Sequence, residues 1–226
     1  MISVLAACVL AASPLGPQER TLLARAGALQ SVSVGQWVTY AAHGGGDRVH
    51  YFRVAVVGEE RDALGRDAAW VEVDFGEHPS FNAPLLQMRF LCAKASGFSA
   101  SGISRLLVAV GADKPREFAT DAVPEVFRLS EPSPAPSTRT DVTKRAGRAL
   151  SLMTPAGRIV AHPTEIVVGQ SVIERVWTSA QVPILQVVRI EMPPIDHRME
   201  VHAFGSDAKS QMVLPHAAQP KIERAR

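Results

Sequence analysis

The stretch RVWTSAQVPILQVVRIE, residues 175–191, joins two β-type runs through a short polar step and a proline. Pro183 has no N–H to donate to a strand ladder, so it belongs at a strand end or at a sheet edge. We therefore expect SAQVP to form a corner between a strand that ends near Trp177 and a second strand, LQVVRIE. The stretch predicts two strands of a β-sheet, and the question is how many more strands join them.

Short β-type runs separated by Gly and Pro turns fill most of the chain. GQWVTYAA leads through GGGD into RVHYFRVAVVGEER, and the turn DALGRD leads into AAWVEVDFGE. This pattern predicts a mainly β protein, built as an antiparallel curved sheet or half β-barrel. A closed β-barrel or a sandwich is the alternative. One helix is expected at residues 17–30, because Pro17 suits the first helical position and Leu22, Ala26 and Leu29 share a face.

The length of 226 residues and the apolar content of 46% fit one large β domain with a proper core. We divide the chain into a signal-like segment at 1–16, a single β-rich domain at 17–215, and a charged tail at 216–226. A Pro/Ser-rich loop, LSEPSPAPSTRT, interrupts the domain at 129–140. The formal net charge of +2 provides no basic stripe for nucleic acid, so no nucleic-acid partner is expected.

Alternation of apolar and polar residues defines a common apolar face. In WVEVDF, Val71, Val73 and Phe75 lie on one side, and Glu72 and Asp74 lie with Trp70 on a side expected to be wet. The same reading gives the apolar-face candidates Met88, Phe90, Val188, Ile190, Met192, Met199 and Val201. One short helix cannot cover such a face, which is therefore either an open cavity or a packed core.

The N-terminal stretch MISVLAACVLAASPLG resembles the hydrophobic region and cleavage zone of a secretory signal. Within it, LAAC at 5–8 resembles the lipobox of bacterial lipoproteins, which implies acylation of Cys8. We favour an ordinary signal that is cleaved near Ala11 and Ala12, with acylation of Cys8 and no processing as the alternatives. We therefore predict that the protein is exported in a bacterium, either to the periplasm or as a lipoprotein of the outer membrane. Membrane association is expected only if Cys8 is acylated.

The runs VGQWVTY, YFRVAVVGEE with AAWVEV, RLLVAVG with KPREF, and VWTSAQVPILQVVRIE resemble uncharacterised secreted bacterial proteins. Those are similar in turn to the LolA/LolB/LppX-like lipoprotein-carrier superfamily. The resemblance lies in the order of strands over residues 32–118 and 160–212, and it carries over no functional residue. It implies a half β-barrel with a hydrophobic cavity, and hence a cell-envelope binding protein for a lipid or lipoprotein acyl chain. The alternative is a non-enzymatic structural or interaction module of the envelope, with an envelope protein as partner and no small ligand.

Motifs for catalysis, metal or cofactors are weak, and we expect none of these functions. HGGG at 43–46 and GFSASG at 97–102 suggest an esterase that uses Ser99 or Ser101 with His43. That enzyme needs a strand, a strained turn and a helix, whereas ISRLLVAVG after GFSASG is a strand. His197 and His202 are an odd number of residues apart and so point to opposite faces of a strand, which predicts no metal site.

Overall fold

The computed structural model describes residues 22, 29, 31–44, 48–99, 101–118 and 142–212. The signal-like segment 1–16 with Cys8, the Pro/Ser-rich loop 129–140 and the tail 216–226 lie outside this part. So does the predicted helix at 17–30, apart from Leu22 and Leu29, both of which are buried.

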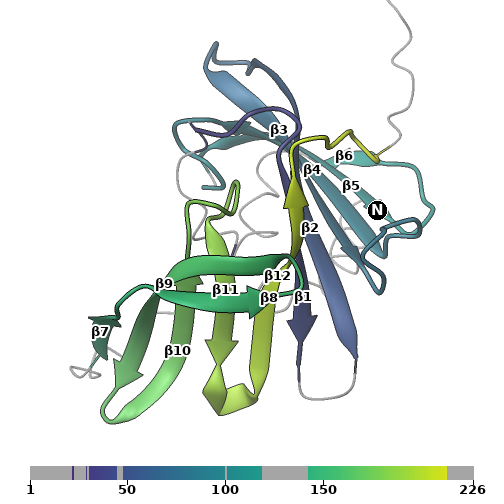
Figure 1. The fold of residues 1–226 in the computed structure, drawn as a ribbon. Helices are drawn as coiled ribbons and strands as arrows, with labels where there is room; N and C mark the ends of the chain where they lie inside the picture. Colours follow the sequence, from purple (N-terminus) through teal and green to yellow (C-terminus); the bar gives the residue numbers. More distant parts are fainter. Residues whose placement is uncertain are drawn as a thin grey trace, which may run out of the picture.

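The described part is one antiparallel sheet with very little helix (Figure 1). The strands of its first half are β1 (Trp37–His43), β2 (Val49–Arg61), β3 (Asp67–Gly76), β4 (Leu86–Ala93), β5 (Ile103–Val110) and β6 (Arg116–Phe118). Those of its second half are β7 (Val142–Ala146), β8 (Leu150–Thr154), β9 (Gly157–Val168), β10 (Ser171–Thr178), β11 (Val187–Met192) and β12 (His197–Gly205). A short 3-10 turn, η2 (Pro193–Ile195), joins the last two.

The sheet has 12 strands in the order β6-β5-β4-β3-β2-β1-β12-β11-β10-β9-β7, and β8 pairs with β9. The two halves of the chain meet where β1 pairs with β12. Because the order ends at β6 on one side and at β7 on the other, the described strands form an open sheet. The predicted mainly β, antiparallel curved sheet is confirmed, whereas the closed barrel and the sandwich are not what the chain forms.

The corner predicted around Pro183 connects β10 to β11. Trp177 lies opposite Arg189 in the two paired strands, and the Ser179 N–H donates to the Gln186 carbonyl at 2.8 Å across the base of the corner. Within the corner, Ile184 and Gln186 have φ angles of 65° and 54°, in the left-handed region that few residues adopt. Val182 and Leu185 are buried there, so apolar packing holds this unusual backbone in place.

One face of the sheet carries the main core, which we call the apolar face. Register places Phe52 beside Phe75, and Val71 beside Phe90, on this face. Leu22 and Leu29 join the same core from the N-terminal side, and Phe98 packs edge-on against Phe90 with ring centroids 6.0 Å apart. Among the described residues, the apolar face is therefore covered by side chains such as Leu22, Leu29 and Phe98 rather than by a second sheet.

The β8–β9 hairpin covers part of the other face, which we call the polar face. β9 pairs with β10 and β7 through its second half and with β8 through its first half. Figure 1 shows the hairpin crossing β11 and β12. Ile159 and Ala161 of β9 are buried, and Arg189 of β11 donates to the Met153 carbonyl of β8 at 3.2 Å.

Candidate functional site

The predicted apolar-face residues all lie on the apolar face, in two groups. Met88 and Phe90 belong to β4, and the others belong to β11 and β12: Val188, Ile190, Met192, Met199 and Val201. Ile190 lies directly opposite Met199 in the sheet. β4 stands four strand spacings from β12, or roughly 19 Å at ~4.8 Å each. The fold brings the second group together, and the first group lies apart on the same core.

These side chains are packed by the chain itself. The exposed fraction is 2% for Met88 and 1% for Met199, and it is 0% for Phe90, Val188, Ile190 and Val201. Met192 is only half-buried. The Tyr40 hydroxyl lies in the same core and donates to the Val187 carbonyl at 3.0 Å, so its one buried polar atom is satisfied.

The polar face of β3 differs from the expectation that it is wet. Glu72 and Asp74 are 0% exposed and Trp70 is 7% exposed, so the expectation was wrong. The reason is the segment after β12. The Ser210 hydroxyl and the Gln211 N–H donate to the Glu72 carboxylate at 2.7 Å and 2.6 Å, and Met212 packs in one cluster with Trp70.

Asp74 lies next to Glu72 on the same face. It accepts hydrogen bonds from Gln87 at 2.9 Å and from Arg53 at 3.3 Å. Burial and the negative charge of Glu72 raise the pKa of the Asp74 carboxyl to about 7, because these two effects outweigh the stabilising contacts with Gln87 and Arg53. Asp74 is thus a buried carboxyl that can change its charge near neutral pH.

Each of the protein's three tryptophans lies on the polar face against an arginine. Arg89 lies 4.8 Å and Arg105 5.1 Å from the Trp70 ring centroid. The remaining pairs, each 5.8 Å apart, are Arg53 with Trp37 and Arg189 with Trp177. In each pair the tryptophan ring covers one side of the guanidinium group, so these are structural contacts within the sheet.

An ion-pair ladder crosses β9 to β12 on the polar face. Arg175 contacts Glu165 at 2.8 Å, and Arg189 contacts Glu200 at 2.8 Å. Glu191 lies between the two arginines at 3.9 Å from each. These charges neutralise one another, which leaves no free anion or cation in the ladder to bind a charged substrate.

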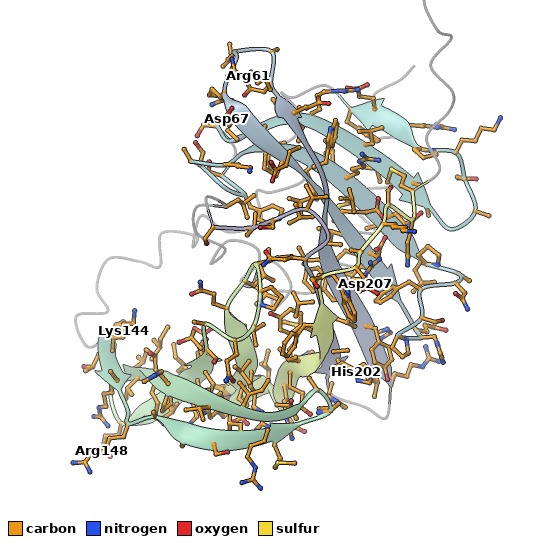
Figure 2. All side chains as sticks on the ribbon, turned by 45° about the horizontal axis from the view of Figure 1, so that its top comes forward. Arg61, Asp67, Lys144, Arg148, His202 and Asp207 are labelled. Atoms are coloured by element: carbon orange, nitrogen blue, oxygen red, sulfur yellow. The ribbon has the colours of Figure 1, made fainter. Side chains whose placement is uncertain are left out.

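A groove of about 370 Å³ lies between β1, β2 and the segment after β12. Its walls include Trp37, Arg53, Phe81 and Lys209. The Trp37 indole N–H donates to the Asp207 carboxylate at 2.8 Å, and Asp207 is labelled in Figure 2. The groove is open and polar, without the deep apolar lining that is typical of a small-molecule site.

The residues of the weak esterase pattern are not brought together. His43 ends β1 and lies opposite Val49, the first residue of β2. Ser99 follows the last residue of β4, which lies beside the start of β3 and hence near the last residue of β2. The 13 residues of β2 separate these two ends, which is roughly 40 Å at ~3.3 Å per residue. Ser99 and Ser101 instead contact each other at 3.3 Å. Among the described residues, no cluster of His, Cys, Asp and Glu could hold a metal ion.

Sequence reasoning missed the Glu72 contacts, and no local signal could have supplied them. Glu72 and Gln211 are 139 residues apart, and the partner atom is a backbone N–H that any residue type provides. Cys92 is a free cysteine that is buried in the core.

No protein-family model matches the chain, and no curated protein matches it. Solved structures with a similar arrangement include an exported-protein candidate with a YmcC-like fold from Bacteroides fragilis (11% identity, TM-score 0.37, 79% of this chain and 99% of that one). MucB in complex with MucA(peri) is matched at 9% identity and a TM-score of 0.42, over 87% of this chain and 57% of that one. A lipoprotein candidate from Parabacteroides distasonis is matched at 9% identity and a TM-score of 0.34, over 76% and 96%. Within the described residues, no helix is long and apolar enough to cross a membrane.

Proposed function

We propose that this chain is a non-enzymatic binding module of the bacterial cell envelope and that its ligand is another protein. The observation that carries the proposal is the packed apolar face. Phe90, Val188 and Ile190 are fully buried by the protein's own side chains, so this part of the face has no surface left for a bound acyl chain. A sheet whose core is filled serves best as a rigid platform for docking through its edges and outer surfaces.

The proposed localisation in the cell envelope rests on the N-terminal sequence. The apolar stretch 1–16 and the LAAC pattern at Cys8 support export, with acylation as the means of attachment to a membrane. Mass spectrometry of the protein purified from its own membrane fraction tests this localisation. A diacyl or triacyl mass on an N-terminal cysteine supports lipoprotein processing, and a cytoplasmic, unprocessed chain contradicts it.

Site-specific photo-cross-linking in the native cells tests the protein ligand. A photoreactive residue is placed in turn at exposed positions on separate elements: Leu64, Lys144, Ile173 and Ile195. We expect one envelope protein to be captured from one side of the molecule and not from the others. If no envelope protein is cross-linked at any of these positions, the proposal is contradicted.

A second candidate is a carrier of an apolar ligand, such as a lipid or lipoprotein acyl chain. It is favoured by the way the apolar face is covered, since single residues such as Leu22 and Leu29 and loop residues such as Phe98 close it. In this candidate, an acyl chain takes the place of these few covering side chains on the apolar face. Saturable binding of a fluorescent fatty acid, with lipid found by native mass spectrometry, supports this candidate. Absence of both contradicts it.

A further inference from the structure

β7 is the last strand of the sheet at one edge, and both of its faces are open. All five of its residues, Val142 to Ala146, are exposed. Successive side chains of a strand point to opposite faces, so a run of exposed residues means that neither face of β7 is covered. Among the described strands, only β9 pairs with β7.

The register shows which backbone groups of β7 are unused. The Gly147 N–H donates to the Pro163 carbonyl at 2.9 Å, which makes these two residues a hydrogen-bonded pair. Bonded pairs alternate along an antiparallel ladder, so Arg145 with Glu165 and Thr143 with Val167 are the next ones. The N–H and C=O groups of Val142, Lys144 and Ala146 therefore point away from β9, toward the open edge.

The charge around this edge is positive. Lys144, Arg145 and Arg148 are exposed and form no ion pair with a described residue. The nearest acidic residue on the neighbouring strand β9 is Glu165, which is already paired with Arg175 at 2.8 Å. Figure 2 shows Lys144 and Arg148 at the same end of the sheet, far from Arg61 and Asp67.

We propose that the edge of β7 is a docking strand that takes up an extended, acidic segment of a partner protein by strand addition. The proposal rests on the proposed function and names the site and the chemistry of its protein ligand. The outward N–H and C=O groups of Val142, Lys144 and Ala146 bind the backbone of the added strand. Lys144, Arg145 and Arg148 select glutamate and aspartate side chains on it.

Charge and hydrogen bonding single out this occupant. A second copy of the chain that paired through β7 would set Lys144 and its basic neighbours against the same residues, and like charges across a strand pair are destabilising. An anionic membrane surface matches the charge but offers no extended backbone to the unused N–H groups. An acidic peptide strand satisfies both the hydrogen bonds and the charge.

The test is an NMR titration of the ¹⁵N-labelled chain with a short capped peptide of alternating glutamate and valine. We expect saturable shifts at the Val142, Lys144 and Ala146 amides, weaker binding at high salt, and no such shifts with the matching lysine–valine peptide. Ala146→Pro removes one outward N–H without altering charge, and it weakens binding about tenfold. Ala146→Val keeps the N–H and is the matched control, with unchanged affinity expected.

A second pair of variants makes the outcome independent of any effect of proline on folding. Lys144→Glu with Arg148→Glu abolishes peptide binding, whereas Lys114→Glu with Arg116→Glu, the same charge change at the β6 edge, leaves it unchanged. Equal binding of both peptides, equal binding by all variants, or shifts confined to other strands overturns the proposal. So does binding of phosphatidylglycerol vesicles alone, or dimerisation through β7 in analytical ultracentrifugation.

Failure of this proposal is distinguishable from failure of the proposed function. Photo-cross-linking to an envelope protein from Ile173 or Ile195, but not from Lys144, removes β7 as the docking site and leaves the protein-binding function in place. No capture from any position removes the function itself.

Discussion

The backbone N–H of Gln211 donates to the Glu72 carboxylate at 2.6 Å, although the two residues are 139 positions apart. Ser210 donates to the same carboxylate at 2.7 Å, and Met212 is buried beside Trp70. The segment after β12 is thereby bound across the centre of β3. It turns a strand face that looks solvated in the sequence into a second, buried layer.

The first prediction concerns this contact. Glu72→Gln replaces the carboxylate that accepts these hydrogen bonds with a neutral amide. We expect the free energy of unfolding to fall by about 2–3 kcal/mol, because hydrogen bonds to a buried charged group contribute more than bonds between neutral groups. Urea unfolding measures the loss, and hydrogen exchange at the Gln211 amide is expected to accelerate. Ser210→Ala is the matched control that removes only one donor, with about 1 kcal/mol expected. Equal exchange at Gln211 in wild type and Glu72→Gln contradicts the contact.

The second prediction concerns Asp74 and pH. Its pKa rises from 3.8 to about 7 in the folded protein because of burial and of Glu72. The folded state therefore binds the proton more tightly than the unfolded state, so the free energy of unfolding falls as the pH rises from about 4 to about 7. The fall is on the order of 4 kcal/mol at most, at about 1.4 kcal/mol per unit, and it is constant above that window.

Asp74→Asn has no proton to lose, so we expect the fall between about pH 4 and pH 7 to flatten in this variant. The control is Asp113→Asn, which alters an exposed carboxyl on the loop after β5. Chemical denaturation at a series of pH values measures both variants against wild type. A profile for Asp74→Asn that parallels wild type through the window rules out Asp74 as the titrating group.

The sheet was predictable because its signals are local. Alternation in segments such as Val71 to Phe75 sets which side chains share a face, and Pro183 marks the corner between β10 and β11. Met88, Ile190 and Met199 fall on the apolar face for the same reason. Whether this face is packed depends on segments far away in the sequence, so alternation alone did not decide between a cavity and a packed core.

The buried polar face and the β7 edge were not predictable in the same way. The burial of Glu72 depends on Ser210 and Gln211, which have no pattern of their own that points to β3. The open edge depends on strand order, which places β7 last in the sheet although it lies in the middle of the chain. Strand order is set by the pairing of whole strands and is not encoded in any single run of residues.

The third prediction uses Cys92. Burial raises the pKa of its thiol, and its side chain is enclosed in the core. The thiolate is the reactive form, so we expect no alkylation of Cys92 by iodoacetamide in the folded protein and complete alkylation in urea. Mass spectrometry measures the modified fraction. Rapid alkylation without denaturant shows instead that the core around β4 opens readily, which is what an acyl-binding cavity requires.

The fourth prediction separates a packed apolar face from a binding cavity. Phe90 is 0% exposed and lies against Phe98, so Phe90→Ala leaves a void and costs about 3–5 kcal/mol in the free energy of unfolding. Met192 on the same face is half-buried, and Met192→Ala is expected to cost about 1–2 kcal/mol. Thermal or urea unfolding gives both values.

Ligand binding by the same variants completes that test. If the face is packed, the wild-type protein binds no fluorescent fatty acid, whereas the void in Phe90→Ala takes up a small apolar molecule such as benzene, as dry engineered cavities do. If the face is a carrier's cavity, the wild type binds the fatty acid and Phe90→Ala enlarges the site with little loss of stability, because the site already holds space. A packed face thus predicts no fatty-acid binding by the wild type and a large loss of stability in Phe90→Ala. A cavity predicts fatty-acid binding by the wild type and a small loss of stability in Phe90→Ala, so these two proteins distinguish the alternatives.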